Sequence, residues 1–186
     1  VSILGNFVNR AFVLMHKLCK GKVPPLHADI LDDADKTMLE EFQNTKTRIE
    51  NLIEGYKFRD ALYEVIDLAR KGNKYMQDKE PWIVAKSLEA NPEAQKQIDN
   101  CLHICLQLTA NLAVFMNPFL PFAAKKMCYM MKVVDKMLDW ENAGKPKLLS
   151  VGYSLRAPEL LFRKIEDDEV KAQVEKLKIK SEKIKM

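Results

Sequence analysis

The sequence predicts an all-α fold: a bundle of about five helices in residues 1–138, followed by an extended arm and a terminal helix in residues 139–186. Three observations predict it. The 186 residues are 47 % hydrophobic, enough for one core, and include only 6 glycines. Apolar residues recur three and four positions apart over long stretches, which is the period of an α-helix. Clusters of glycine and proline divide these stretches into separate helices.

Glycine and proline mark the boundaries of the predicted helices. Gly21 ends the first helix, Gly55 ends the second, and Gly72 interrupts the third near its end. Pro81 begins a short helical stretch, because a proline at the first position removes no intrahelical hydrogen bond. Asn-Pro-Glu at 91–93 starts the next helix, with the asparagine as its N-cap. The five predicted helices span residues 1–20, 32–53, 57–75, 91–116 and 122–137, and the short helical stretch spans residues 82–88.

The C-terminal quarter of the chain has a different pattern. Residues 139–165 lack a helical period and contain several glycines and prolines, so we expect an extended arm laid over the bundle. A charged helix begins near Glu166, and its acidic start complements the helix dipole. Its sparse apolar face, formed by Val170, Val174 and Leu177, predicts peripheral packing on the bundle.

The composition excludes several classes of protein. The formal net charge of +4 permits a nucleic-acid partner without requiring one. The chain has no glycine-rich phosphate loop and no nucleophile beside a base, so we expect it to hold no catalytic residue and no cofactor. We see no signal peptide and no apolar run near the ~18–20 residues that span a membrane. We therefore expect no membrane partner.

The four cysteines form no Cys-x-x-Cys pair and lie among apolar residues, as free buried cysteines do. Cys101, His103 and Cys105 suggest a metal site. However, His103 should point away from the helix face that the two cysteines share, so we expect no metal. Reduced cysteines indicate a cytoplasmic protein.

Two places suit nucleic acid. Asn6 and Arg10 are four residues apart and so lie on one helix face, where an amide and a guanidinium could contact a base edge or a phosphate. A solvated or structural polar pair would have the same spacing. Trp82 follows Pro81, and an exposed tryptophan could stack on an unpaired base. A tryptophan packed in the core is the alternative.

Five blocks, each weak alone, together resemble the helical anticodon-binding domain of methionyl-tRNA synthetases. They occur in the family's order and cover almost the whole chain. They are Leu4-Gly5-Asn6-Phe7-Val8-Asn9-Arg10, Asn73-Lys74-Tyr75, Pro81-Trp82, Asn117-Pro118-Phe119-Leu120-Pro121, and an arm with Gly152-Tyr153, Pro158-Glu159 and Leu161-Phe162-Arg163-Lys164-Ile165-Glu166-Asp167.

The resemblance implies a partner and a role for each candidate residue. The family's domain receives the CAU anticodon loop of tRNA(Met), with its bases splayed outward. Carried over by position, Trp82 would stack on the first anticodon base, a cytosine, while Asn6 and Arg10 would contact anticodon bases. Asn73 would fix the turn that leads to Trp82, and Pro81 would set the approach of the ring.

The resemblance also implies that the parent protein is an enzyme, a methionine–tRNA ligase. The ATP-binding HIGH-like and KMSKS-like signatures of class I synthetases are absent, so we expect ATP and Mg to bind a catalytic domain of the same polypeptide that this chain lacks. The chain alone should then be inactive, with RNA and not DNA as its ligand. Two alternatives remain: the helical anticodon domain of another class I synthetase, and a helical interaction scaffold that binds no RNA.

Overall fold

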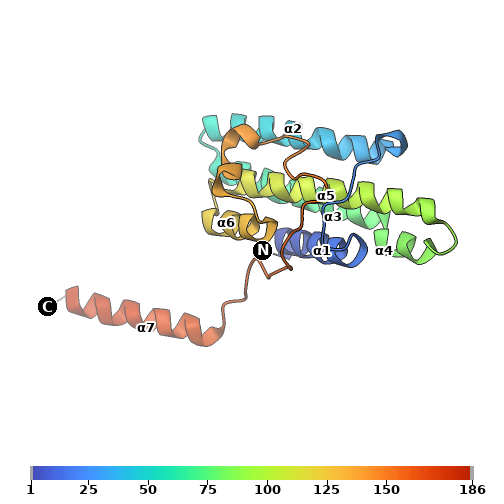
Figure 1. Cartoon of the computed structure of the whole chain (residues 1–186). Coiled ribbons are helices and arrows are strands. Elements are labelled where there is room, and N and C mark those ends of the chain that lie inside the picture. The colour runs from blue at the N-terminus through green and yellow to red at the C-terminus, as the bar shows by residue number, and fades with distance from the viewer. Residues whose placement is uncertain (1, 185–186) are drawn as a thin grey trace.

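The computed structural model describes the backbone of residues 2–184 and the side chains of residues 2–177 (Figure 1). It confirms the all-α prediction: within the described residues there is no strand, only an isolated antiparallel bridge between Lys22 and Ser154. The α-helices are α1 (Ser2–Leu18), α2 (Asp33–Glu54), α3 (Phe58–Lys79), α4 (Pro81–Val84), α5 (Gln95–Met116), α6 (Pro121–Met131) and α7 (Asp167–Ile184). Short 3-10 turns are η1 (Ala28–Ile30), η2 (Ala85–Ser87), η3 (Pro92–Ala94), η4 (Asp135–Leu138) and η5 (Trp140–Asn142).

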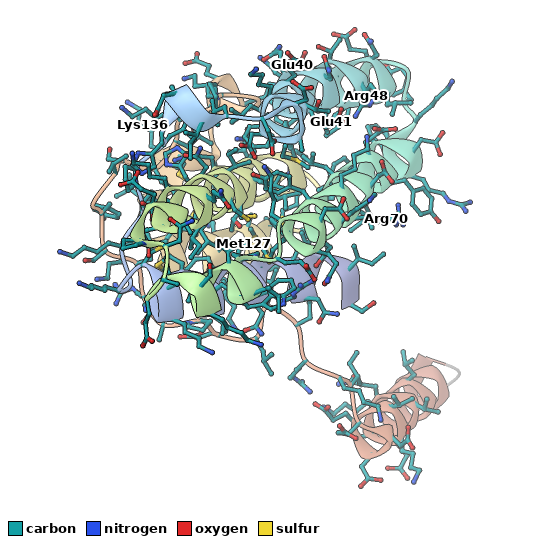
Figure 2. All side chains as sticks on the ribbon, turned by 90° about the vertical axis from the view of Figure 1, so that its right-hand side faces the viewer. Glu40, Glu41, Arg48, Arg70, Met127 and Lys136 are labelled. Atoms are coloured by element: carbon teal, nitrogen blue, oxygen red, sulfur yellow. The ribbon has the colours of Figure 1, made fainter. Side chains whose placement is uncertain are left out.

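Helix α5 is the centre of the bundle and packs against α1, α2, α3 and α6. Every residue from 100 to 116 is buried. Contrary to our expectation, the 25-residue stretch Pro92–Met116 is long and apolar enough for a membrane span by length and composition alone. The 18-residue apolar window within this stretch is completely buried inside the bundle, as is typical of a core helix. Met127 of α6 also lies inside, whereas Glu40 and Arg70 point outward (Figure 2).

Gly72 does not interrupt α3, as the sequence suggested, because the helix continues to Lys79. A Cβ atom at Gly72 would lie 2.5 Å from Leu108 Cδ2 and 2.8 Å from Phe7 Cε2. The glycine therefore allows α1, α3 and α5 to approach closely, and its small size matters more than its helix-breaking tendency.

Two helix ends also differ from the predictions. Helix α6 stops at Met131, earlier than expected, because Lys132 adopts a left-handed conformation with φ of 55° and its N–H bonds the Cys128 carbonyl. Asn91 precedes a 3-10 turn, and its side chain makes no capping hydrogen bond. The regular helix α5 begins only at Gln95.

The arm after the bundle is extended and lies across it. The Val23 N–H donates to the Tyr153 carbonyl at 3.0 Å, and the Gly152 N–H donates to the Val23 carbonyl at 2.8 Å. Nearer the start of the arm, the buried side chain of Gln107 accepts hydrogen bonds from the backbone N–H groups of Leu148 and Leu149 at 2.7 and 2.9 Å. These bonds attach the arm to the loop after α1 and to α5.

Helix α7 stands away from the bundle (Figure 1), so the peripheral packing expected from the sequence was wrong. Val170, Val174 and Leu177 are all exposed. Three apolar side chains on an otherwise charged helix bury too little surface to fix it against the bundle. The acidic residues predicted at its start do occupy the first turn.

Candidate nucleic-acid interface

The structure brings together Arg10 of α1 and Trp82 of α4, which are 72 residues apart in the sequence. The guanidinium carbon of Arg10 lies 5.4 Å from the centroid of the Trp82 ring, a cation–π distance. Both side chains are half-buried. Trp82 packs partly against the core and is partly open to solvent, so it matches neither alternative drawn from the sequence.

The position of Trp82 depends on a sharp change of direction after α3. Glu80 adopts the left-handed conformation, with φ of 43° and ψ of 52°, and ends α3. Pro81 is buried and occupies the first position of α4, as predicted. The N–H groups of Ile83 and Val84 bond the Glu80 carbonyl at 2.8 and 3.1 Å, which fixes the first turn of α4.

Two amides of α3 hold the Arg10 guanidinium. It donates to Asn73 Oδ1 and to Gln77 Oε1, each at 3.4 Å. The Asn73 amide nitrogen in turn donates to the carbonyls of Ile3, at 3.0 Å, and Ala69, at 3.1 Å, which sets the orientation of its oxygen. Asn73 therefore lies inside α3 and joins it to α1; it does not fix the turn before Trp82, as the resemblance had suggested.

The charge of Arg10 is not neutralised by a carboxylate. Among the ion pairs of residues 2–177, none includes Arg10. Neutral amides orient the guanidinium and leave its positive charge available to a ligand. A cation and a partly exposed indole at one place suit an unpaired nucleotide, which offers both a flat base and an anionic phosphate.

A hollow of about 320 Å³ opens beside this pair. Asn6 is exposed one turn before Arg10 on α1 and does not line this hollow. Its lining residues are Asn9, Arg10, Val13, Leu14 and Trp82.

Sequence reasoning missed the contributions of Asn9, Val13 and Gln77. The available signals were weak: Gln77 is four residues after Asn73, and Val13 is four residues after Asn9, so each pair shares a helix face. Only the packing of α1 against α3 and α4 shows which faces meet.

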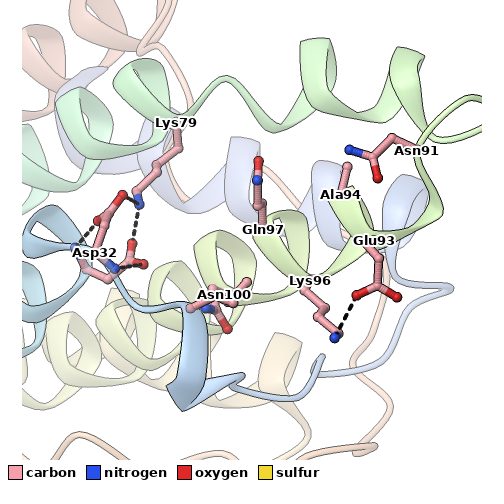
Figure 3. Close-up of a pocket in the computed structure, with 10 residues that line it drawn as sticks. Asp32, Lys79, Asn91, Glu93, Ala94, Lys96, Gln97 and Asn100 are labelled. Atoms are coloured by element: carbon pink, nitrogen blue, oxygen red, sulfur yellow. Dashed lines mark hydrogen bonds and ion pairs between the residues drawn. The ribbon is translucent and has the colours of Figure 1, made fainter.

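A larger and more polar hollow of about 390 Å³ is lined by Lys79, Asp32 and Asp35 together with the start of α5 (Figure 3). The Lys79 ammonium lies 2.6 Å from Asp32 Oδ2 and 2.5 Å from Asp35 Oδ1. The Tyr75 hydroxyl donates to Asp35 Oδ1 at 2.7 Å. Asp32 and Asp35 also form the capping box that starts α2.

This charged network has a structural role. The hydrogen bond from Lys79 lowers the pKa of Asp32, and burial raises the pKa of Tyr75, which keeps its hydroxyl a donor. Elsewhere in the hollow, Lys96 pairs with Glu93 at 2.7 Å. Three carboxylates and only two ammonium groups line the hollow, so it attracts an anion less strongly than Arg10 does. The network instead anchors the end of α3, which precedes Trp82 in the chain by three residues.

The cysteines and histidine that suggested a metal site are buried among apolar side chains. Cys101 and Cys105 lie in the core, and His103 Nδ1 bonds the Pro24 carbonyl at 2.8 Å. Burial lowers the pKa of His103. Burial has the opposite effect on thiols: it raises the pKa of Cys19 to about 12 and that of Cys128 to about 11, so these thiols stay protonated at neutral pH.

Comparison with known proteins identifies relatives of this chain. A family model described as the anticodon binding domain of methionyl tRNA ligase matches residues 25–182. The methionine–tRNA ligase of Bacteroides fragilis (strain YCH46) is 46 % identical over 177 residues, which cover 95 % of this chain and 25 % of that protein. The methionine–tRNA ligase of Cytophaga hutchinsonii is 47 % identical over 178 residues, or 95 % and 24 % of the two chains. The chain thus spans about a quarter of the length of these relatives.

A solved structure has a similar fold. Mycobacterium tuberculosis methionyl-tRNA synthetase in complex with methionyl-adenylate aligns with a TM-score of 0.79 and 22 % sequence identity. The alignment covers 87 % of this chain and 31 % of that one.

Proposed function

Since this chain belongs to the family of anticodon-binding domains of methionyl-tRNA ligases, we propose that it binds the CAU anticodon loop of tRNA(Met) at Arg10 and Trp82. The observation that carries the proposal is the Arg10 guanidinium, oriented by neutral amides and placed 5.4 Å from the centroid of the Trp82 ring. Each part of this pair has a counterpart in an unpaired nucleotide.

The proposed chemistry is non-covalent. The free part of the Trp82 indole stacks on the first anticodon base, a cytosine, which contributes ~1–3 kcal/mol. Arg10 directs its remaining donors to a base edge or to the neighbouring phosphate. Asn6, exposed one turn away, supplies a donor and an acceptor to a second base. Asn73 and Pro81 hold Arg10 and Trp82 in place.

The remaining partners belong to the parent protein. We propose that a catalytic domain of the same polypeptide binds ATP and Mg, activates methionine and transfers it to the tRNA. This chain is then inactive alone, and its place of action is the cytoplasm, where translation supplies the tRNA.

The test is an anticodon exchange. An anticodon stem-loop with CAU and matched hairpins with changed anticodons are titrated against this chain at low salt, because few phosphate contacts make the affinity salt-sensitive. We expect the CAU hairpin to bind at least tenfold more tightly, and a DNA hairpin of the same sequence to bind less tightly. Preference for another anticodon would favour another class I synthetase, and equal or no binding would favour a scaffold without an RNA role.

A further inference from the structure

Acidic residues are absent from three long stretches of the sequence. Residues 1–28, 100–134 and 142–158 contain four, three and three Lys or Arg residues and no Asp or Glu. All 26 acidic residues lie in the rest of the chain, together with the other 20 of the 30 basic ones. Segregation of charge on this scale gives one part of a protein a positive potential, whatever the modest net charge of the whole.

The fold brings parts of the acid-free stretches together where α1, α6 and the arm meet. They form α1, α5 with α6, and the arm, and Figure 1 shows α1 and α6 along the edge opposite α2. The arm joins them: the Leu155 N–H donates to the Gly21 carbonyl at 3.1 Å, and the Arg156 N–H donates to the Met130 carbonyl at 2.9 Å. Glu40 and Glu41 lie on the other side, on α2 (Figure 2).

Four exposed cations meet where the arm crosses, and we call Lys20, Lys22, Lys132 and Arg156 the basic patch. None of the four forms an ion pair with any side chain that the structure describes. The guanidinium carbon of Arg156 lies 4.2 Å from the centroid of the Tyr129 ring, and its Nε donates to the Tyr129 carbonyl at 3.0 Å. The ring contact and this hydrogen bond thus hold Arg156, which stays exposed, in one orientation.

Three carboxylates border the basic patch, and each has a side-chain partner outside the patch. The patch cations therefore keep their charge for an external anion. The pairs are Asp99 with His27 at 3.1 Å, Asp135 with Lys125 at 3.8 Å, and Glu159 with Lys126 at 3.8 Å.

We infer that the basic patch binds phosphates of the RNA stem adjoining the loop held at Arg10 and Trp82; this rests on the proposed function. Leu18, the last residue of α1, is eight residues from Arg10, or about 12 Å at 1.5 Å per residue, and Lys20 follows two residues later. One strand carries a phosphate about every 3.4 Å of helix axis. A single RNA hairpin therefore reaches both places, with its unpaired bases at Trp82 and its backbone on the patch. Such phosphate contacts position the RNA and carry no sequence information.

The test is the salt dependence of binding for the anticodon stem-loop of tRNA(Met) and the same hairpin with a changed anticodon. The double variant Lys20→Gln/Lys22→Gln removes two charges from the patch. We expect it to weaken the binding of both hairpins by the same factor. The slope of log K against log salt should become less steep by about 1.8, since each phosphate contact contributes ~0.9 to it. The linear loop sequence alone, without a stem, should lose much less affinity in the same double variant.

The matched control is Lys57→Gln/Arg59→Gln, at the turn between α2 and α3. Both residues are exposed, and Arg59 stacks on Tyr63 at 5.4 Å much as Arg156 stacks on Tyr129. The net charge falls equally, so equal weakening by the control would show a general charge effect and overturn the inference. If thermal melting shows that the patch double variant is destabilised, Lys132→Gln replaces it, with an expected slope change of about 0.9.

Other outcomes separate this inference from the proposed function. An unchanged slope with an intact preference for CAU would overturn phosphate binding by the basic patch and leave the proposed anticodon binding intact. A loss restricted to the CAU hairpin would also overturn the patch, because phosphate contacts are blind to the bases. Absence of anticodon preference with a patch-dependent slope would overturn the proposed function. No binding of any hairpin at low salt would overturn both.

Discussion

Replacing Trp82 by alanine removes the stacking platform and the partner of Arg10 together. Loss of a base stack costs ~1–3 kcal/mol of binding free energy, and each 1.4 kcal/mol is a factor of about ten. We therefore expect the CAU stem-loop to bind about 5- to 150-fold more weakly. Trp82→Phe keeps a smaller ring in the same place, so it should retain part of the affinity.

The same substitution also affects stability, because the ring is half-buried and packs partly on the core. An exposed ring, one of the two alternatives drawn from the sequence, would leave the fold intact when truncated. Half of a tryptophan buries roughly 100 Å², worth about 2.5 kcal/mol. In a domain of this size that lowers the thermal midpoint by about 5–10 °C. Binding must therefore be measured well below the midpoint of the variant.

Trp140→Ala is the matched control for Trp82→Ala. Trp140 is also half-buried, its ring centroid lies 5.9 Å from that of Phe115, and its Nε1 donates to Glu50 at 2.8 Å. It should lose similar stability without losing RNA affinity. If both variants weakened binding of the hairpin equally, or if Trp82→Ala bound it normally, the result would show that Trp82 has no direct contact with the RNA. In the full-length ligase, Trp82→Ala should lower tRNA charging and spare ATP–pyrophosphate exchange.

Three further predictions concern the fold that supports the site. Gly72→Ala should lower the free energy of unfolding by about 1–2 kcal/mol, because its Cβ would meet Leu108 at 2.5 Å; a more stable variant in urea titration would contradict this. Lys79→Met leaves the buried Asp35 without its cation and should cost about 3 kcal/mol, whereas a loss below about 1 kcal/mol would show that the pair is not structural. Burial raises the pKa of Glu41, but hydrogen bonds from two cations lower it overall. Its stabilising contribution is therefore present above its ordinary pKa of 4.5 and is lost as the pH falls through its lower folded pKa. Urea titrations from pH 7 to 3 should show that Glu41→Gln reduces the loss of unfolding free energy at acid pH. An unchanged loss would exclude Glu41 as its source.

Several elements of the fold could be predicted from local sequence alone. Helical periodicity and the helix-breaking residues predicted the all-α class and most helices, because these depend on interactions within a few residues. The start of α4 at Pro81 followed from the same local chemistry. The ordered motifs indicated the family before any coordinates, and the family model confirms it.

Residues whose role depends on distant partners were harder to predict. Gly72 and Asn73 both looked like local features, an interruption and a turn residue, but they lie inside α3 and serve its contact with α1. The apolar positions of α7 predicted packing that the structure lacks, since helical periodicity shows which face is apolar and not whether a partner covers it.

The sequence by itself determined that this chain is a helical member of its family and that Asn6, Arg10 and Trp82 are its candidate RNA contacts. Only the tertiary structure decided that Arg10 meets Trp82, that Gln77 helps to hold Arg10, and that the arm joins the ends of α1 and α6. The physical reason is that a helix face is set by residues three and four apart, whereas a contact between faces is set by core packing across the whole chain.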